Sequence, residues 1–176
     1  MNLLQSCLLF ALLFFSAAVH SQTTQASECA ALHAIFLRGE GTDGGPFNGQ
    51  VMTPLSDQIV STIPNSSSIA IAYDSGNLDK PVAVYNASMM FNEYVAQYVE
   101  SCPDSKIMVL GYSLGADGVM DSLCGTSSIL YIPSPTLDLK YRANIALIVI
   151  FAEESYVSGQ AWNTGNCTSG HGVRIY

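Results

Sequence analysis

Short apolar runs alternate along the chain with longer stretches in which apolar residues recur at helical spacing. The runs predict buried β-strands at 32–37, 68–73, 106–110 and 144–151. The stretches between them predict helices at 51–63, 82–100 and 116–123, with Pro54 in the first turn of the first helix. The run 144–151 is the most apolar and predicts a central strand. The segment 125–142 contains Pro133 and Pro135 and predicts irregular structure.

This alternation of strands and helices predicts an α/β fold. Right-handed crossovers would produce a mostly parallel central sheet with helices on both faces, a three-layer sandwich. In such sheets functional residues gather at the carboxyl ends of the strands. Arg38-Gly39-Glu40 follows one predicted strand and Gly111-Tyr112-Ser113 follows another, so we expect the two segments to lie side by side.

The first 21 residues have the pattern of a secretory signal peptide. The apolar core Leu8–Phe15 is followed by small residues, with cleavage expected near Ser21. The alternative is a membrane anchor, for which this core is short. We therefore expect a secreted, extracellular protein whose single domain spans 22–176. The net charge of -8 argues against nucleic acid and membrane surfaces as partners, and we expect a monomer.

Cysteine and histidine usage narrows the chemistry further. Cys7 would leave with the signal peptide. Four cysteines would remain in an oxidising compartment, and they allow three pairings: Cys29, Cys102, Cys124 and Cys167. Without a C-x-x-C motif and with only three histidines, neither a metal site nor a cofactor is expected. Three sequons are candidate glycosylation sites, at Asn65, Asn86 and Asn166.

The segment Gly111-Tyr-Ser-Leu-Gly115 matches the pattern G-x-S-x-G between a predicted strand and a predicted helix. Glycines two positions away on each side permit a strained turn that lifts Ser113 out of the backbone. The helix N-terminus would then direct free N–H groups at a developing oxyanion. This context favours Ser113 as a catalytic nucleophile, and the alternative is an ordinary turn.

A serine nucleophile requires a histidine base and an acid that orients it. His33 lies within the first predicted strand and is interpreted as structural. His171 follows Ser113 in the expected order and is a candidate base, with a residue of the chain tail as the alternative. The candidate orienting acids between them are Asp138, Glu153 and Glu154. Two further acids follow Ser113 and are interpreted as surface residues near a helix start: Asp117 and Asp121.

The chain resembles the cutinase and acetylxylan esterase family of secreted serine esterases. The resemblance covers nearly all of 22–176 and is most specific in Ser101-Cys-Pro-Asp-Ser-Lys-Ile-Met-Val-Leu-Gly-Tyr-Ser-Leu-Gly-Ala116. It continues in Cys29 with Leu32-His-Ala-Ile-Phe, in Arg38-Gly39, and in three later segments: Met120–Gly125, Ala146–Phe151 and Gly159–Cys167.

This resemblance implies a cutinase-like α/β-hydrolase fold, Ser113 as nucleophile and a Cys29–Cys102 disulfide. The backbone N–H groups of Leu114 and Glu40 would stabilise the oxyanion. Leu114 stands where the family usually has Gln, and Glu40 where Ser or Thr usually follows Arg-Gly. The family carries its catalytic Asp and His in a segment beyond the position of Tyr176, so the C-terminal portion of the fold is expected to be missing. That segment also supplies partners for the positions of Cys124 and Cys167, which here would pair with each other or stay free.

Two functions follow. The first is a secreted serine esterase, without a cofactor, that acts through an acyl-enzyme on cutin, acetylated xylan or small soluble esters. The alternative is a truncated, catalytically inactive secreted relative that acts as a binding or surface protein, or an incomplete gene product.

Overall fold

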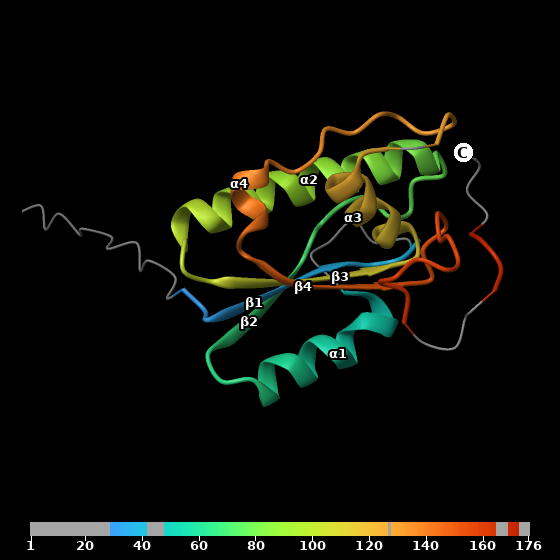
Figure 1. The fold of residues 1–176 in the computed structure, drawn as a ribbon. Coiled ribbons are helices and arrows are strands. Elements are labelled where there is room, and N and C mark those ends of the chain that lie inside the picture. Colours follow the sequence, from blue (N-terminus) through green and yellow to red (C-terminus); the bar gives the residue numbers. More distant parts are fainter. Residues whose placement is uncertain (1–28, 42–47, 127, 165–168, 173–176) are drawn as a thin grey trace, which may run out of the picture.

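The computed structural model describes residues 29–41, 48–126, 128–164 and 169–172. Within these residues, parallel strands form one sheet in the order β2-β1-β3-β4 (Figure 1). The strands are β1 (Leu32–Leu37), β2 (Ser66–Ala70), β3 (Lys106–Tyr112) and β4 (Ile145–Phe151). The helices are α1 (Gly49–Thr62), α2 (Lys80–Ser101), α3 (Leu114–Cys124) and α4 (Leu139–Arg142). The predicted signal peptide lies outside the described residues.

Helices cover both faces of the sheet, as predicted. In Figure 1, α1 lies on one face, and α2 and α3 lie on the other. The alternation of side chains along β1 explains this arrangement, because Ile35 packs in the cluster beneath α2 while Phe36 packs in the cluster beneath α1. Both β1 side chains are fully buried. The three-layer α/β prediction is therefore confirmed. Among the described helices, none has both the length and the hydropathy that a membrane crossing requires.

Several predicted boundaries need correction. Helix α1 begins two residues earlier than predicted, at Gly49, so Pro54 lies beyond its first turn. Strand β2 covers Ser66–Ala70 rather than 68–73, because serines that carry no hydrophobic signal pair with β1. The short helix α4 lies within the segment predicted as irregular, where the Asp138 side chain accepts a hydrogen bond from the Lys140 N–H.

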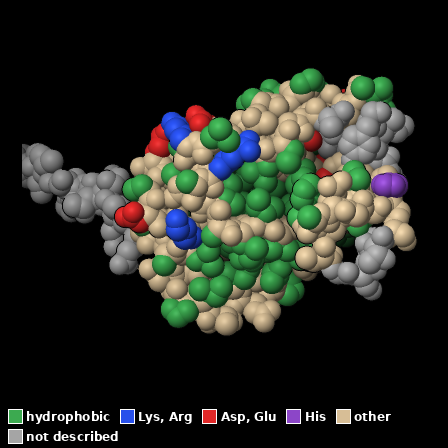
Figure 2. Space-filling view, viewed as in Figure 1, with side chains coloured by type: hydrophobic (Ala, Val, Ile, Leu, Met, Phe, Trp, Pro, Cys, Tyr) green, Lys and Arg blue, Asp and Glu red, His purple; other side chains and the backbone are tan. Residues whose placement is uncertain are grey.

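Strand β4 is the most apolar strand, yet the prediction that it is central is wrong. It pairs with β3 and forms an edge of the sheet in the described part of the chain. Its side chains Leu147, Ile148 and Phe151 are between 42% and 48% exposed. Figure 2 shows apolar side chains gathered across the middle of the face on which β4 lies in Figure 1. Apolar composition indicates that a strand favours burial, but its neighbours in the sheet decide how much it obtains.

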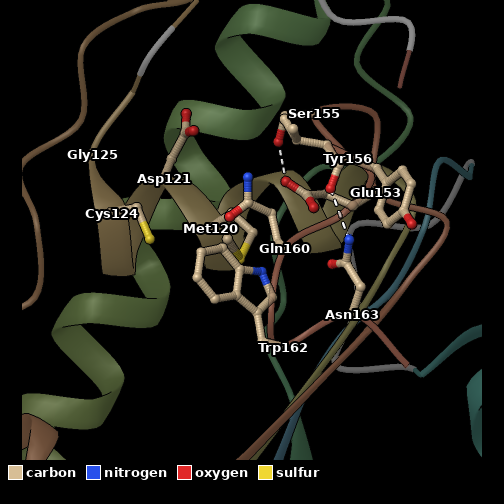
Figure 3. A pocket seen from close by; sticks show the side chains of 11 residues that line it. Met120, Asp121, Cys124, Gly125, Glu153, Ser155, Tyr156, Gln160, Trp162 and Asn163 are labelled. Carbon is tan, nitrogen blue, oxygen red and sulfur yellow. Dashed lines mark hydrogen bonds between the residues drawn. The ribbon is translucent and has the colours of Figure 1, made fainter. Parts of the chain in front are cut away.

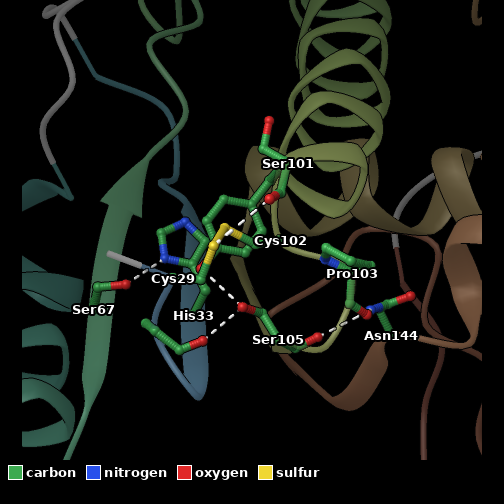
Figure 4. Close-up of a disulfide and its surroundings, with 10 residues drawn as sticks. Cys29, His33, Ser67, Ser101, Cys102, Pro103, Ser105 and Asn144 are labelled. Atoms are coloured by element: carbon green, nitrogen blue, oxygen red, sulfur yellow. Dashed lines mark hydrogen bonds between the residues drawn. A yellow bond between two sulfur atoms is a disulfide. The ribbon is translucent and has the colours of Figure 1, made fainter. Parts of the chain in front are cut away.

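A disulfide joins Cys29, just before β1, to Cys102 at the end of α2, with 5.6 Å between their Cα atoms (Figure 4). The pairing implied by the family resemblance is therefore present. Ser105 lies beside it and donates a hydrogen bond to the backbone oxygen of Ala30 at 2.6 Å. Cys124 is an exposed free thiol, and Cys167 lies outside the described residues.

His33 lies next to this disulfide and is 5% exposed (Figure 4). Its ring nitrogens lie 2.7 Å from Ser67 Oγ and 2.8 Å from Tyr94 Oη. The ring stacks on Tyr98 with 4.0 Å between centroids. Burial lowers the pKa of His33 from its ordinary value of 6.5 to about 4. The interpretation of His33 as a structural residue is therefore confirmed.

The buried imidazole predicts a pH-dependent stability. The unfolded chain binds a proton near pH 6.5, whereas the folded protein binds it only near pH 4. Stability is thus retained above pH 6.5, falls as the pH drops from 6.5 to about 4, and levels off below. We expect this loss in urea unfolding curves, and we expect it to be smaller in His33→Phe, which cannot be protonated. Equal pH dependence in both proteins would contradict the prediction.

Candidate active site

Strand β3 ends in a sharp turn at Ser113, from which α3 begins. Ser113 has φ 50° and ψ -123°, a left-handed conformation that is strained for a residue with a side chain. Its N–H donates to the Phe151 oxygen at 2.9 Å, and its own carbonyl accepts from the Ala116 N–H at 2.8 Å. Ser113 is partly exposed. The strand, the turn and the helix predicted from the sequence are thus all present. The chain does not run smoothly from β3 into α3, because it turns sharply at Ser113.

Both glycines of the motif are required because a side chain would not fit at either position. A Cβ atom at Gly111 would lie 2.8 Å from the Ala116 Cα. A Cβ atom at Gly115 would lie 2.3 Å from the backbone oxygens of Leu37 and Arg38. Real Cβ contacts are longer than this, so only glycine lets α3 approach β1 and β3 so closely.

The segment after β1 lies beside Ser113, as predicted. Leu37 pairs with Gly111 in the sheet, and a Cβ atom built on Gly39 would lie 3.3 Å from the Ser113 Cβ. The N–H groups of Glu40 and Leu114 follow Gly39 and Ser113 directly. Neither donates to another residue in the part of the chain that the structure describes. Two backbone N–H groups without a described acceptor therefore belong to the residue after Ser113 and to the residue after Gly39.

Buried Arg38 anchors this segment to the residues that follow β2. Its guanidinium donates to Ser75 Oγ at 2.9 Å, to the Ile71 oxygen at 3.1 Å and to the Tyr73 oxygen at 2.5 Å. The Tyr73 hydroxyl donates back to the Arg38 carbonyl. Burial raises the pKa of Tyr73, so this hydroxyl remains a neutral donor. The Gly41 N–H donates to the Ser75 oxygen at 3.0 Å, so Glu40 lies between two anchored residues, Arg38 and Gly41.

The Glu40 side chain forms an ion pair with Lys80, a lysine that no sequence motif marks. Lys80 Nζ lies 3.3 Å from Glu40 Oε2 and 3.6 Å from Glu154 Oε1. Hydrogen bonding to Glu40, followed by the charge of Glu154, raises the pKa of Lys80. The sequence could have indicated Lys80, because a lysine at the first residue of a helix interacts unfavourably with the helix dipole. A lysine at this position therefore points to a favourable interaction elsewhere.

Asp117 and Asp121 are not surface acids, which corrects the prediction. They are 0% and 3% exposed. Asp117 Oδ1 accepts the backbone N–H of Glu154 at 3.0 Å, and Asp121 Oδ2 accepts the Thr126 hydroxyl at 2.9 Å. Asp117 lies in the first turn of α3, where the helix dipole favours a carboxylate. It thereby ties the loop after β4 to the helix that begins next to Ser113.

The other candidate acids, Asp138 and Glu153, and the candidate base, His171, lie in different parts of the described structure. Asp138 caps α4, which precedes β4 and so lies toward the amino ends of the strands (Figure 1). Glu153 accepts a hydrogen bond from Ser155. His171 is exposed and its backbone pairs with Val157 in an isolated bridge. No hydrogen bond joins a histidine to Ser113 among the described residues.

The three sequons lie in different environments. Asn65 is exposed, at the turn before β2. Asn86 is partly buried within α2, and Asn166 lies outside the described residues.

A pocket of about 220 Å³ lies between α3 and the loop after β4 (Figure 3). Its wall includes Met120, Cys124, Glu153 and Trp162, and it does not include Ser113. Ser113 therefore does not line this pocket.

Comparison with known proteins assigns the family. The cutinase family model matches residues 28–173. This chain belongs to the cutinase family. It is 23% identical over 161 residues to an acetylxylan esterase of Hypocrea jecorina, covering 86% of this chain and 52% of the relative. It is 26% identical over 152 residues to Cutinase 11 of Verticillium dahliae, covering 80% of this chain and 50% of the relative.

Solved structures agree on the fold. The catalytic core domain of acetyl xylan esterase from Trichoderma reesei aligns with a TM-score of 0.70 and 21% identity, covering 81% of this chain and 72% of that one. At this identity the likeness supports the fold alone. The chain spans about half the length of the curated relatives that it matches.

Proposed function

We propose that this cutinase-family protein is a secreted carboxylic ester hydrolase in which Ser113 is the nucleophile. The observation that carries the proposal is the left-handed turn at Ser113, which presents a partly exposed serine near two backbone N–H groups without another acceptor in the described structure. Strain of this kind persists only where the surrounding structure imposes it. Here Gly111, Gly115 and the pairing of β1 with β3 impose it.

The reaction would proceed through an acyl-enzyme. Ser113 Oγ forms a bond to the carbonyl carbon of the ester, its proton passes to a base, and the carbonyl electron pair moves to the oxygen. The intermediate collapses, the C–O bond to the alcohol breaks, and the alcohol leaves with a proton. Water then attacks the acyl group on Ser113, which releases the acid and restores the hydroxyl.

The N–H groups of Leu114 and Glu40 would stabilise the negative oxygen of both intermediates. The Leu114 N–H belongs to the first turn of α3, whose dipole adds to the stabilisation. Because backbone donors are held by the fold, they need little reorganisation when charge develops. The side chains at these positions, Leu and Glu, need not take part.

Known relatives suggest the substrate class. They include proteins named acetylxylan esterase and cutinase. We infer from these names that the substrate is an ester of a plant polymer, such as cutin or acetylated xylan, or a small soluble ester.

A fluorophosphonate probe tests the proposal, because it modifies only serines that act as nucleophiles. We expect mass spectrometry to find one adduct on Ser113 of the purified protein and no adduct on Ser113→Ala. Circular dichroism of both proteins confirms that they are folded. A folded wild-type protein that remains unlabelled would contradict the proposal and favour the inactive, secreted binding protein.

A further inference from the structure

The geometry points to Lys80 as a positioning residue for the oxyanion-binding loop, an inference that rests on the proposed function of Ser113. Lys80 holds the Glu40 carboxylate away from the oxygen that develops negative charge, and it links the two loops on either side of Ser113.

The sheet order places Lys80 across the turn at Ser113. Strand β3, which leads into Ser113, lies between β1 and β4. The loops after β1 and β4 therefore flank Ser113. Lys80 Nζ contacts a carboxylate from each of these loops, Glu40 at 3.3 Å and Glu154 at 3.6 Å. Its own backbone begins α2, after the loop that follows β2. One ammonium group thus joins segments that follow three of the strands.

The Glu40 side chain carries the negative charge that Lys80 balances. The Glu40 backbone N–H is one of the two donors that would bind the oxyanion. The same residue therefore carries both an oxyanion donor and a negatively charged side chain. A negative charge there repels a second negative charge that forms in the transition state. The ion pair with Lys80 directs this carboxylate to one side and balances its charge.

The ion pair with Glu154 fixes the position of the Lys80 ammonium group. The Glu154 side chain is only 20% exposed, against 52% for Glu40, and the Tyr131 hydroxyl donates to its Oε2 at 3.5 Å. Its backbone N–H is held by Asp117 in α3. Exposed ion pairs contribute little to the free energy of unfolding. We therefore explain this arrangement by the positive charge that it holds beside Glu40, and not by a contribution to stability.

The test measures the second-order rate constant for labelling of Ser113 by the fluorophosphonate, whose phosphoryl oxygen occupies the oxyanion site. We expect Lys80→Gln to react about fivefold more slowly than wild type, since the Glu40 charge is no longer balanced. Lys80→Arg should retain the wild-type rate. Lys80→Gln combined with Glu40→Gln should recover most of the lost rate. Added 1 M salt should also restore Lys80→Gln, because it screens the carboxylate.

A matched control is Lys140→Gln, which removes a lysine of α4 that pairs with Glu100 of α2 at 3.8 Å. Its rate should equal that of wild type. If Lys80→Gln reacts as fast as wild type, or if removal of the Glu40 charge and added salt both fail to rescue it, the inference is wrong. If wild type itself is not labelled, the proposed function of Ser113 fails first, and the two failures are thereby distinguished.

Discussion

Alanine in place of Gly115 is expected to destabilise the protein by about 3 kcal/mol or more. Helix propensity alone predicts the opposite, because alanine in a helix is about 1 kcal/mol more favourable than glycine. The added Cβ atom, however, would lie 2.3 Å from two backbone oxygens of β1 and the residue after it. Backbone atoms of a buried strand cannot rotate away, so α3 and Ser113 would have to move.

Urea unfolding of graded glycine variants measures this effect. Gly118→Ala would place a Cβ atom 2.7 Å from the Ala87 Cβ, a longer contact than the 2.3 Å contacts at Gly115, so a smaller loss is expected. Among the described residues, a Cβ atom at Gly41 meets no atom closer than 3.7 Å, so Gly41→Ala serves as the control. A Gly115→Ala protein as stable as the control would show that α3 does not pack against β1 as described.

Loss of the disulfide has the second large effect. Cys29 and Cys102 are separated by 73 positions, so the bond removes much of the conformational freedom of the unfolded chain. We expect the double variant Cys29→Ala/Cys102→Ala to lose about 4 kcal/mol of unfolding free energy. The measurement is urea unfolding at constant pH, with wild type in dithiothreitol as a second route to the same state.

The matched control for that experiment is Cys124→Ser, because Cys124 is an exposed free thiol. Its unfolding midpoint should stay close to that of wild type. If the double variant also unfolds with the wild-type midpoint, the bond does not constrain the unfolded chain, and the packing of β1 against α2 accounts for the stability of this region.

Much of the fold could be predicted because its signals are local. Apolar runs and helical spacing follow from how each segment buries its own side chains, and these patterns located the strands and the three longer helices. The turn at Ser113 was also predictable, since G-x-S-x-G describes a backbone conformation that neighbouring residues determine. The ends of the strands were less certain: Ser66 and Ser67 pair with β1 although the predicted strand begins at residue 68.

The errors concern relations between segments. Asp117 was interpreted as a surface acid from its place near a helix start, but the loop after β4 covers it. Strand β4 was expected at the centre from its apolar composition, but composition does not specify which strands lie beside it. Lys80 carried no motif, because its contacts come from Glu40 and Glu154, which are 40 and 74 positions away in the sequence.

The sequence by itself determined the class of fold, the presence of a serine on a strained turn and the expectation that the segment after β1 lies beside it. All three depend on residues that are adjacent in the chain or on the rule that parallel strands share one carboxyl edge. Only the tertiary structure decided that Arg38 anchors this loop through the residues after β2 and that Lys80 lies between Glu40 and Glu154. Those arrangements arise because folding brings distant segments into contact, where distances and charges, rather than local pattern, determine what each side chain does.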